Sequence, residues 1–367
     1  MKQRSVRQDS PYYSGITRRQ ALGFLGTGTA AALSAKDSRL PKGAIIRTVL
    51  QDLRPEELAA GATLFHEHLS LAPDFMPRWI ALARGGRSGA APPSAQPFFM
   101  EDLDLMVDEV KTAHREGVSC IVDGGHEDMG RRLDFLKQIS ERSGMPIVAS
   151  TGFYTQPFYP PEIAGWSEDQ IAQDVIHKAN TQPLGALGEI GSWDLITDDE
   201  RKVFRAIAKV HRATNLPIFT HTGIPGKSAM EQLDILEKGG VKPARVVIGH
   251  LGNLVDPEVK VQSEICKRGA FVGFDRQGGP GDAQQVPMVL KLIDEGYADH
   301  LMFASDFSSA TQLKRNGGAG YAKTVTVFAP KLRAAGVKED VLHGILVDNP
   351  RRFLAFVPRK SRRSLGV

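Results

Sequence analysis

The stretch Gly61-Ala-Thr-Leu-Phe-His-Glu-His-Leu69 joins an apolar run to a pair of histidines. The run at 62–65 is short, apolar and preceded by a glycine, which is the pattern of a buried strand. His66 and His68 follow it directly, and residues two apart on an extended chain point to the same side. The stretch therefore predicts a buried strand that carries two imidazoles on one side of its carboxyl end.

Seven further runs of this kind follow along the chain, and helical stretches separate them. Apolar residues at helical spacing are clear over 103–113, 204–211 and 230–236. Eight alternating strand and helix units predict an α/β fold, a single-domain (β/α)8 TIM barrel. An open doubly wound sheet is the competing fold, but the chain has no Gly-rich phosphate loop to support it. The predicted strands are 62–65, 119–122, 146–149, 186–190, 218–220, 245–249, 270–274 and 301–304.

The charge of the chain is concentrated at its start. The 367 residues include 46 Lys and Arg against 42 Asp and Glu, a formal net charge of +4. Five basic residues and one acidic residue in 1–35 account for that excess. The remainder is formally neutral, so the chain lacks the electrostatic footprint of a nucleic-acid-binding protein.

Residues 1–35 have the pattern of an export signal. Thr17-Arg18-Arg19 precedes a mild apolar run at 21–35, rich in Gly and Ala. The run is too short to span a bilayer, so we expect no stable membrane insertion. The segment resembles twin-arginine signals, which predicts a periplasmic or secreted protein; a frayed cytoplasmic extension is the alternative. The barrel is then expected over 36–357 and a basic tail over 358–367.

Reactive side chains stand at the carboxyl ends of five predicted strands, where barrel enzymes place their active sites. Four imidazoles and two carboxylates suit zinc first, with manganese, iron or cobalt as alternatives. Six ligands exceed the need of one tetrahedral ion and predict two divalent transition-metal ions. The predicted ligands are His66, His68, Glu189, His221, His250 and Asp306.

Four segments carry a family resemblance: 61–69, 217–223, 247–252 and 303–306. Together with the closing Asp348-Asn-Pro-Arg-Arg-Phe-Leu354, they resemble the phosphotriesterase family of the amidohydrolase superfamily. The resemblance extends over roughly residues 45 to 356 and implies a binuclear-metal barrel hydrolase with a small-molecule substrate. It also implies a homodimer, by analogy with family members.

The resemblance divides the predicted ligands between two ions. It places His66, His68 and Asp306 on one ion, and His221 and His250 on the other. Many members bridge the two ions with a carboxylated lysine on the fourth strand. This chain has Glu189 in a Gly-Glu-Ile-Gly setting, which resembles the phosphotriesterase homology proteins.

Three other positions point to a branch of the family. Arg276 and Tyr154 resemble residues of the lactonases, and Asn253 stands where a carboxylate often completes a proton relay. Loss of that carboxylate disfavours efficient phosphotriester turnover. The predicted reaction is hydrolysis of a lactone, a carboxylic ester or, weakly, an organophosphate triester.

The predicted mechanism uses a hydroxide that bridges the two ions, because bridging lowers the pKa of water toward neutrality. Asp306 is expected to accept a proton, and Arg276 to hold the departing group or to pair with Asp275 or Glu67. Tyr154, Trp193 and Arg276 are the predicted substrate contacts, with the loops at 277–286 and 308–324. Two other classes stay open: amide hydrolysis or deamination on the same metals, and a metal-dependent binding protein without turnover.

The remaining conspicuous residues have structural interpretations. Residues 73–97 are expected to form an irregular insertion, and Asp123 to fix loops by hydrogen bonds. His126 lies near the predicted rim, with substrate contact as the less favoured interpretation. Cys120 and Cys266 are expected in the core. The histidines expected on the surface are His114, His177, His211, His300 and His343.

Overall fold

The structure is a computed structural model that describes residues 40–85, 98–223 and 226–359. The predicted export signal at 1–35 lies outside the described residues, as does the basic tail from residue 360 onward. The described residues belong to one compact unit and form a single domain. Among them, no helix is long and apolar enough to cross a membrane.

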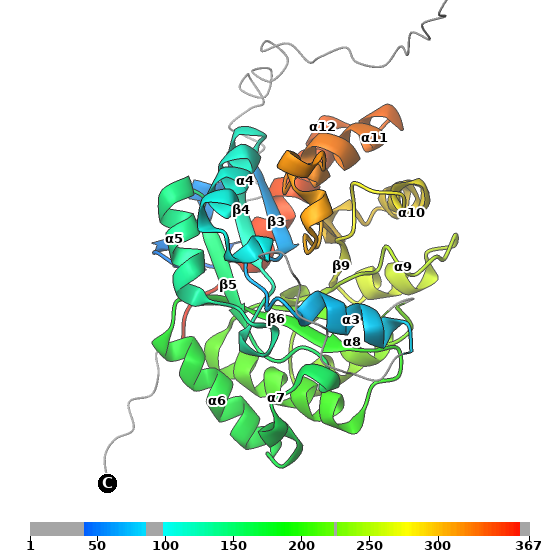
Figure 1. Cartoon of the computed structure of the whole chain (residues 1–367). Coiled ribbons are helices and arrows are strands. Elements are labelled where there is room, and N and C mark those ends of the chain that lie inside the picture. The colour runs from blue at the N-terminus through cyan, green and yellow to red at the C-terminus, as the bar shows by residue number, and fades with distance from the viewer. Residues whose placement is uncertain (1–39, 86–97, 224–225, 360–367) are drawn as a thin grey trace, which may run out of the picture. The chain divides into compact units, whose positions relative to one another are not determined.

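Eight parallel strands lie side by side in chain order, and helices cover their outer face (Figure 1). This arrangement confirms the predicted (β/α)8 barrel, and all eight predicted strands are present. The strands are β3 Ala62–Glu67, β4 Val118–Asp123, β5 Ile147–Thr151, β6 Leu184–Ser192, β7 Ile218–Thr222, β8 Val246–Ile248, β9 Phe271–Phe274 and β10 Leu301–Phe303.

The helices follow the strands and bury their apolar faces against them. In α4, Met106, Val107 and Val110 are buried, as the helical spacing predicts. A two-stranded sheet, β1 Ile46–Arg47 and β2 Asp52–Leu53, precedes the barrel. The α-helices are α3 Phe75–Ala83, α4 Leu103–Arg115, α5 Leu133–Ser143, α6 Glu168–Thr181, α7 Asp198–Thr214, α8 Ala229–Lys238, α9 Lys260–Lys267, α10 Asp282–Asp294, α11 Ala329–Ala334, α12 Glu339–His343 and α13 Asn349–Leu354.

Apolar side chains also fill the inside of the barrel. Phe65 and Phe219 meet edge to face, with ring centroids 6.5 Å apart. Cys120 is buried in the same cluster, and burial raises the pKa of its thiol to about 12. Because the strands are buried on both faces, their sequences are continuous apolar runs rather than alternating ones. This explains why short apolar runs located the strands.

The insertion after β3 is not irregular throughout, which corrects the expectation for 73–97. Its first part forms α3, and Phe75, Met76 and Trp79 recur on one face of that helix. Phe75 is buried, and Met76 and Trp79 pack against the same cluster. Because the second part of the insertion is rich in Gly and Pro, the whole segment was expected to be irregular, and the short amphipathic helix was missed. Residues 86–97 lie outside the described residues.

One of the histidines expected on the surface is buried. His211 lies in α7, and its Nδ1 is 2.7 Å from the backbone oxygen of Leu216. It occupies the apolar face of the helix together with Phe204 and Ile207, so its burial follows from the helical spacing. The contact with Leu216 ties the end of α7 to the residues that enter β7.

The barrel closes between β3 and β10 largely through one side chain. The carboxylate of Glu67 accepts hydrogen bonds from Ser305 N at 2.8 Å, Ser305 Oγ at 2.7 Å and Phe307 N at 3.0 Å. The backbone nitrogen of Asp306 also donates to the carbonyl of His66 at 3.2 Å. Glu67 points away from its neighbours His66 and His68, because side chains alternate along a strand. It therefore joins the first and last strands while the histidines face the rim.

Replacing Glu67 by Gln is expected to destabilise the fold. The change puts an amide N–H₂ opposite backbone donors, and an unsatisfied buried donor costs about 1–3 kcal/mol. Thermal unfolding should be measured at pH 8, above the pKa of about 7 that burial gives Glu67. The exposed Glu231→Gln, which removes one charge of a surface pair with Arg201, is the matched control. Equal melting temperatures for the two variants would contradict this role of Glu67.

Candidate metal centre

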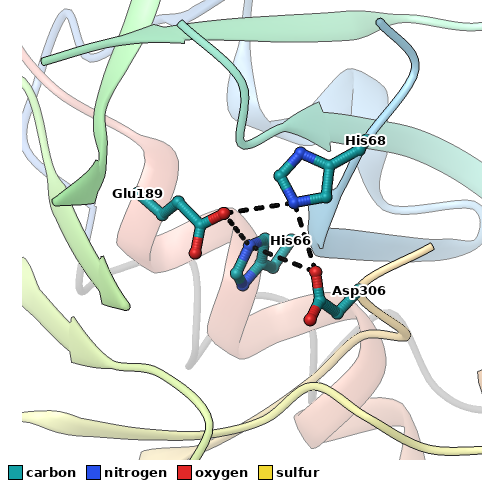
Figure 2. A group of neighbouring side chains, drawn as sticks. All are labelled: His66, His68, Glu189 and Asp306. Atoms are coloured by element: carbon teal, nitrogen blue, oxygen red, sulfur yellow. Dashed lines mark ion pairs between the residues drawn. The ribbon is translucent and has the colours of Figure 1, made fainter. Parts of the chain in front are cut away.

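The barrel brings all six predicted metal ligands to one rim. β3 carries His66 and is followed directly by His68, β6 carries Glu189 and β7 carries His221. His250 and Asp306 follow the ends of β8 and β10. Figure 2 shows His66, His68, Glu189 and Asp306 pointing toward one another. Parallel strands around a barrel end on the same face, so residues far apart in sequence meet there.

One group of ligands surrounds the oxygen Oε1 of Glu189. This atom lies 3.1 Å from His68 Nε2 and 3.4 Å from His66 Nε2. Asp306 Oδ1 lies 3.2 Å from the same nitrogen of His68. Ligands bound to one tetrahedral zinc at 2.0–2.1 Å stand about 3.3 Å apart. These side chains therefore have the spacing of ligands around a single ion.

A second group surrounds the other oxygen of the same carboxylate. Glu189 Oε2 lies 3.0 Å from His221 Nδ1 and 3.5 Å from His250 Nε2. The two imidazole nitrogens are 2.8 Å apart. Glu189 thus turns one oxygen to each ligand group, which is the arrangement of a carboxylate that bridges two ions.

The donor atoms fit metal ions in their chemistry as well as in their spacing. Among the described residues, the buried His66 Nε2 makes no hydrogen bond, and it faces only the carboxylate oxygens of Glu189 at 3.4 Å and Asp306 at 3.9 Å. Leaving a buried nitrogen unpaired costs about 1–3 kcal/mol, and a bound cation would remove that cost. Two overlapping groups of three or four ligand atoms share Glu189, so the residues present fit a pair of ions.

The electrostatics of the rim favour positive charge. Burial would raise the pKa of Glu189, but His66, His221 and His250 outweigh it and hold that pKa well below its usual value. Burial lowers the pKa of His68, but Asp306 and Glu189 outweigh it and raise the pKa to about 9. Without metal, protons on His66 and His68 compensate the buried carboxylates, whereas burial and the neighbouring His250 lower the pKa of His221 to about 4. A divalent ion can replace these protons.

A seventh residue, Asp275, orients two of the imidazoles. Its Oδ2 lies 3.0 Å from His66 Nδ1, and its Oδ1 lies 2.8 Å from His250 Nδ1. Each contact fixes a ring so that Nε2 points to the ligand groups. Asp275 was predicted only as a partner of Arg276. Its place at the end of β9, beside the ligand-bearing ends of β8 and β10, was the signal available in the sequence.

His126 and Asp123 support the rim from outside it. His126 is buried, its Nε2 lies 3.0 Å from the backbone oxygen of Glu189, and its Nδ1 contacts Asp128. It therefore holds the main chain of the bridging residue. Asp123 accepts hydrogen bonds from Leu69 N and Gly125 N, as the prediction that it fixes loops requires.

A cavity of about 320 Å³ opens onto Glu189 and Asp306. This volume is at the lower end of the range of small-molecule sites, so it favours a compact substrate. Helix α3 contributes Phe75, Met76 and Trp79 to its wall. The predicted specificity loops contribute Gln277, Gly279, Ser308, Gln312 and Lys323.

The two predicted aromatic contacts occupy different places. Tyr154 lines the cavity, and its hydroxyl accepts a hydrogen bond from Trp79 Nε1 at 2.8 Å and lies 3.0 Å from His221 Nδ1. Trp193 is not among the described residues that line the cavity. Its ring stacks on that of Trp79, with the centroids 6.1 Å apart, so it contacts a residue of the wall.

Arg276 has a different partner from the two that were expected. Its Nε lies 2.8 Å from Asp306 Oδ2, whereas Asp275 and Glu67 are occupied by other donors. Its guanidinium also lies over the Trp79 ring, 5.6 Å from the centroid. Arg276 therefore holds the outer oxygen of Asp306 at the boundary between the ligand groups and the cavity.

The sequence of the barrel matches a known family model. The model of the phosphotriesterase family matches residues 46–354. The chain belongs to this family. Its relatives include the N-acetyltaurine hydrolase of Danio rerio, which is 25% identical over 346 residues, 85% of this chain and 98% of the relative.

Solved structures agree with this membership. The phosphotriesterase homology protein of Escherichia coli, solved with phosphate in its active site, is 28% identical with a TM-score of 0.70. The similarity covers 81% of this chain and 99% of that one. A lactonase of Listeria monocytogenes is 26% identical with a TM-score of 0.72, over 84% of this chain and 98% of that one. Membership and site together make this phosphotriesterase-family protein a metal-dependent hydrolase.

Asp275→Asn is expected to weaken metal binding without removing a ligand. The amide can no longer accept from both imidazoles, and loss of such an orienting partner costs about 10–100-fold in metal affinity. Metal analysis and competition with a chelator should give about two ions per chain in the wild type and a weaker site in the variant. Asp134→Asn, at an exposed position of α5, is the control. Unchanged metal affinity in Asp275→Asn would contradict the orienting role.

Zinc affinity is expected to rise with pH up to about 9. Below the His68 pKa of about 9, zinc must displace a proton from that imidazole, so the apparent affinity falls as the pH falls. Each competing proton changes the affinity by about tenfold per pH unit, and His66, whose pKa is lowered by burial but raised more strongly by Glu189 and Asp275, adds a second such proton. Zinc titrations between pH 6 and 10 should show this slope and proton release on binding. An affinity independent of pH would contradict it.

Proposed function

We propose that this chain hydrolyses lactones or carboxylic esters with two divalent transition-metal ions, zinc first. When bound, such a pair of ions supplies an activated water and polarises the substrate's carbonyl oxygen. The division of Glu189 between the ligand groups supports the binuclear site. His66, His68 and Asp306 would hold one ion, and His221 and His250 the other.

The contact between Arg276 and Asp306 is the observation that favours hydrolysis of a lactone or an ester. A guanidinium stays protonated in proteins, so Arg276 cannot accept a proton from Asp306 as an imidazole relay would. A proton taken up at Asp306 Oδ2 must therefore pass directly to the leaving group or to water. In a lactone the leaving oxygen stays tethered within reach, which suits this direct return. Asn253 does not line the cavity among the described residues, and it provides no carboxylate for a longer relay.

Tyr154 is suited to orient the substrate. Burial, together with Glu189, raises the pKa of its hydroxyl well above the usual value, so the hydroxyl stays protonated. This oxygen accepts from Trp79, and the His221 ring is its other neighbour, so the hydroxyl hydrogen is available to a carbonyl or leaving oxygen in the cavity when His221 acts as a metal ligand. Arg276 is the second predicted substrate contact, through the guanidinium nitrogens that do not hold Asp306.

Amide hydrolysis is the second candidate. The relatives named N-acetyltaurine hydrolase match this chain over almost their whole length, and N-acetyltaurine is an amide. An amine leaves less readily than an alkoxide, so amide hydrolysis depends more strongly on transfer of a proton from Asp306 to the leaving group. We also propose that residues 1–35 direct export to the periplasm or beyond. The proposal includes a homodimer and no nucleic-acid partner.

A substrate panel on the zinc-loaded protein tests the function. We expect turnover of lactones or aryl esters to exceed that of a paraoxon-type triester, and Asp306→Asn to lower it by about 10²–10⁴-fold. An acetamide series separates the ester from the amide candidate, and Asp294→Asn on the exposed side of α10 is the control. Metal content is measured for each variant. Full activity in Asp306→Asn would contradict the proton-transfer role. If no substrate is turned over, the proposed function is wrong and the alternative of a metal-dependent binding protein without turnover is supported.

A further inference from the structure

The cavity contains a polar side chain that the proposed chemistry does not use. Gln277 lines it, is 1% exposed, and follows Arg276 at the end of β9. Neither the nitrogen nor the oxygen of its carboxamide has a hydrogen-bond partner among the described residues. A buried amide without partners costs about 1–3 kcal/mol, so the arrangement is explained if a ligand supplies them.

Lys323 stands at the same wall. It is 7% exposed and lines the cavity. Within the described parts of the chain, its ammonium has neither a hydrogen bond nor an ion pair within 4.0 Å. Burial lowers its pKa, and Glu67, Asp306 and Asp282 act in the opposite direction. A buried cation without a contacting anion is rare in proteins.

Glu67 is the obvious alternative partner of Lys323, but its oxygens are taken. Both accept hydrogen bonds from Ser305 and Phe307. Lys323 lowers the pKa of Glu67 from a distance, against the larger effect of burial, without forming an ion pair with it. The long-range attraction therefore leaves the N–H donors of the ammonium free for another acceptor.

The path of the Lys323 stem is fixed by a glycine. Gly278 has φ +78°, and a Cβ there would lie 2.8–2.9 Å from Cβ, Cγ and Cδ of Lys323. The backbone of the loop thus packs directly against the methylene groups. Gly278 N also donates to Asp282 Oδ1 of α10 at 2.9 Å, which anchors the loop. The packing of this loop therefore holds Gln277 and Lys323 in fixed positions on the same wall of the cavity.

We propose that Gln277 and Lys323, with the free guanidinium nitrogens of Arg276, form a subsite for an anionic group of the substrate. This inference rests on the proposed function and narrows its substrate class. The substrate is an acyl compound that also carries a carboxylate, a sulfonate or a phosphate. Gln277 Nε2 and Lys323 Nζ donate hydrogen bonds to its oxygens.

The charge of the cavity supports this substrate class. The two carboxylates in its lining, Glu189 and Asp306, are the predicted metal ligands. When they are engaged by cations, Arg276 and Lys323 are left as uncompensated positive charges in the lining of the cavity. An anion bound beside them and hydrogen-bonded to Gln277 would compensate part of this charge, which is favourable at low dielectric.

Calorimetric titration of the zinc-loaded protein tests the subsite independently of turnover. The probes are propane-1-sulfonate, butanoate and neutral butanamide. In Lys323→Met we expect both anions to bind at least tenfold more weakly and butanamide to bind as in the wild type. Lys323→Arg should recover part of the anion affinity, and Lys291→Met, at a partly exposed ion pair with Glu258, is the control.

Two results would overturn the subsite. One is equal anion affinity in the wild type and Lys323→Met, because the anions would then bind elsewhere, such as at the metals. The other is a wild type that binds the anions no better than butanamide. Melting temperatures show whether Lys323→Met folds, and Gln277→Leu tests the same surface with no change of charge; we expect it to weaken anion binding as well.

Kinetics separate this inference from the function on which it rests. The wild type should hydrolyse 4-acetoxybenzoate with a kcat/KM at least tenfold above that of phenyl acetate, and Lys323→Met should lose the preference through KM. Hydrolysis of both esters at equal rates by both proteins overturns the subsite alone. Hydrolysis of neither ester, nor of the corresponding acetamides, nor of any lactone in the panel overturns the proposed function, and the titrations still decide the subsite.

Discussion

The site depends on the closure of the barrel between β3 and β10, and that closure depends on the buried carboxylate of Glu67. Side-chain alternation on β3 gives neighbouring residues opposite tasks. Glu67 binds the backbone that follows β10, while His66 and His68 face the rim. The contact that closes the barrel thereby also sets the position of Asp306 against the two histidines.

At the rim, each of two buried carboxylates contacts more than one imidazole. Glu189 turns one oxygen to each group of imidazoles, and Asp275 holds two of those imidazoles from behind. Burial strengthens each of these interactions, because water does not screen them. The same burial makes the arrangement costly without cations, which is why the ligand chemistry and the proposed hydrolytic function belong together.

The cavity above the rim combines two kinds of wall. Helix α3 and Tyr154 supply aromatic surface, and the loops after β9 and β10 supply Arg276, Gln277 and Lys323. Arg276 belongs to both halves of the site, since it holds Asp306 and also faces the cavity. In the proposed enzyme this couples recognition of the substrate to the group that moves the proton.

The sequence by itself determined the eight strands and the convergence of the six predicted ligands. Strands buried on both faces must be apolar runs, and parallel strands must end on one rim. The tertiary structure alone decided which side chains meet across that rim. Asp275 bridges His66 and His250, Arg276 pairs with Asp306, and α3 covers the cavity. These contacts join residues up to 209 positions apart through loops and side-chain directions, which no local periodicity encodes.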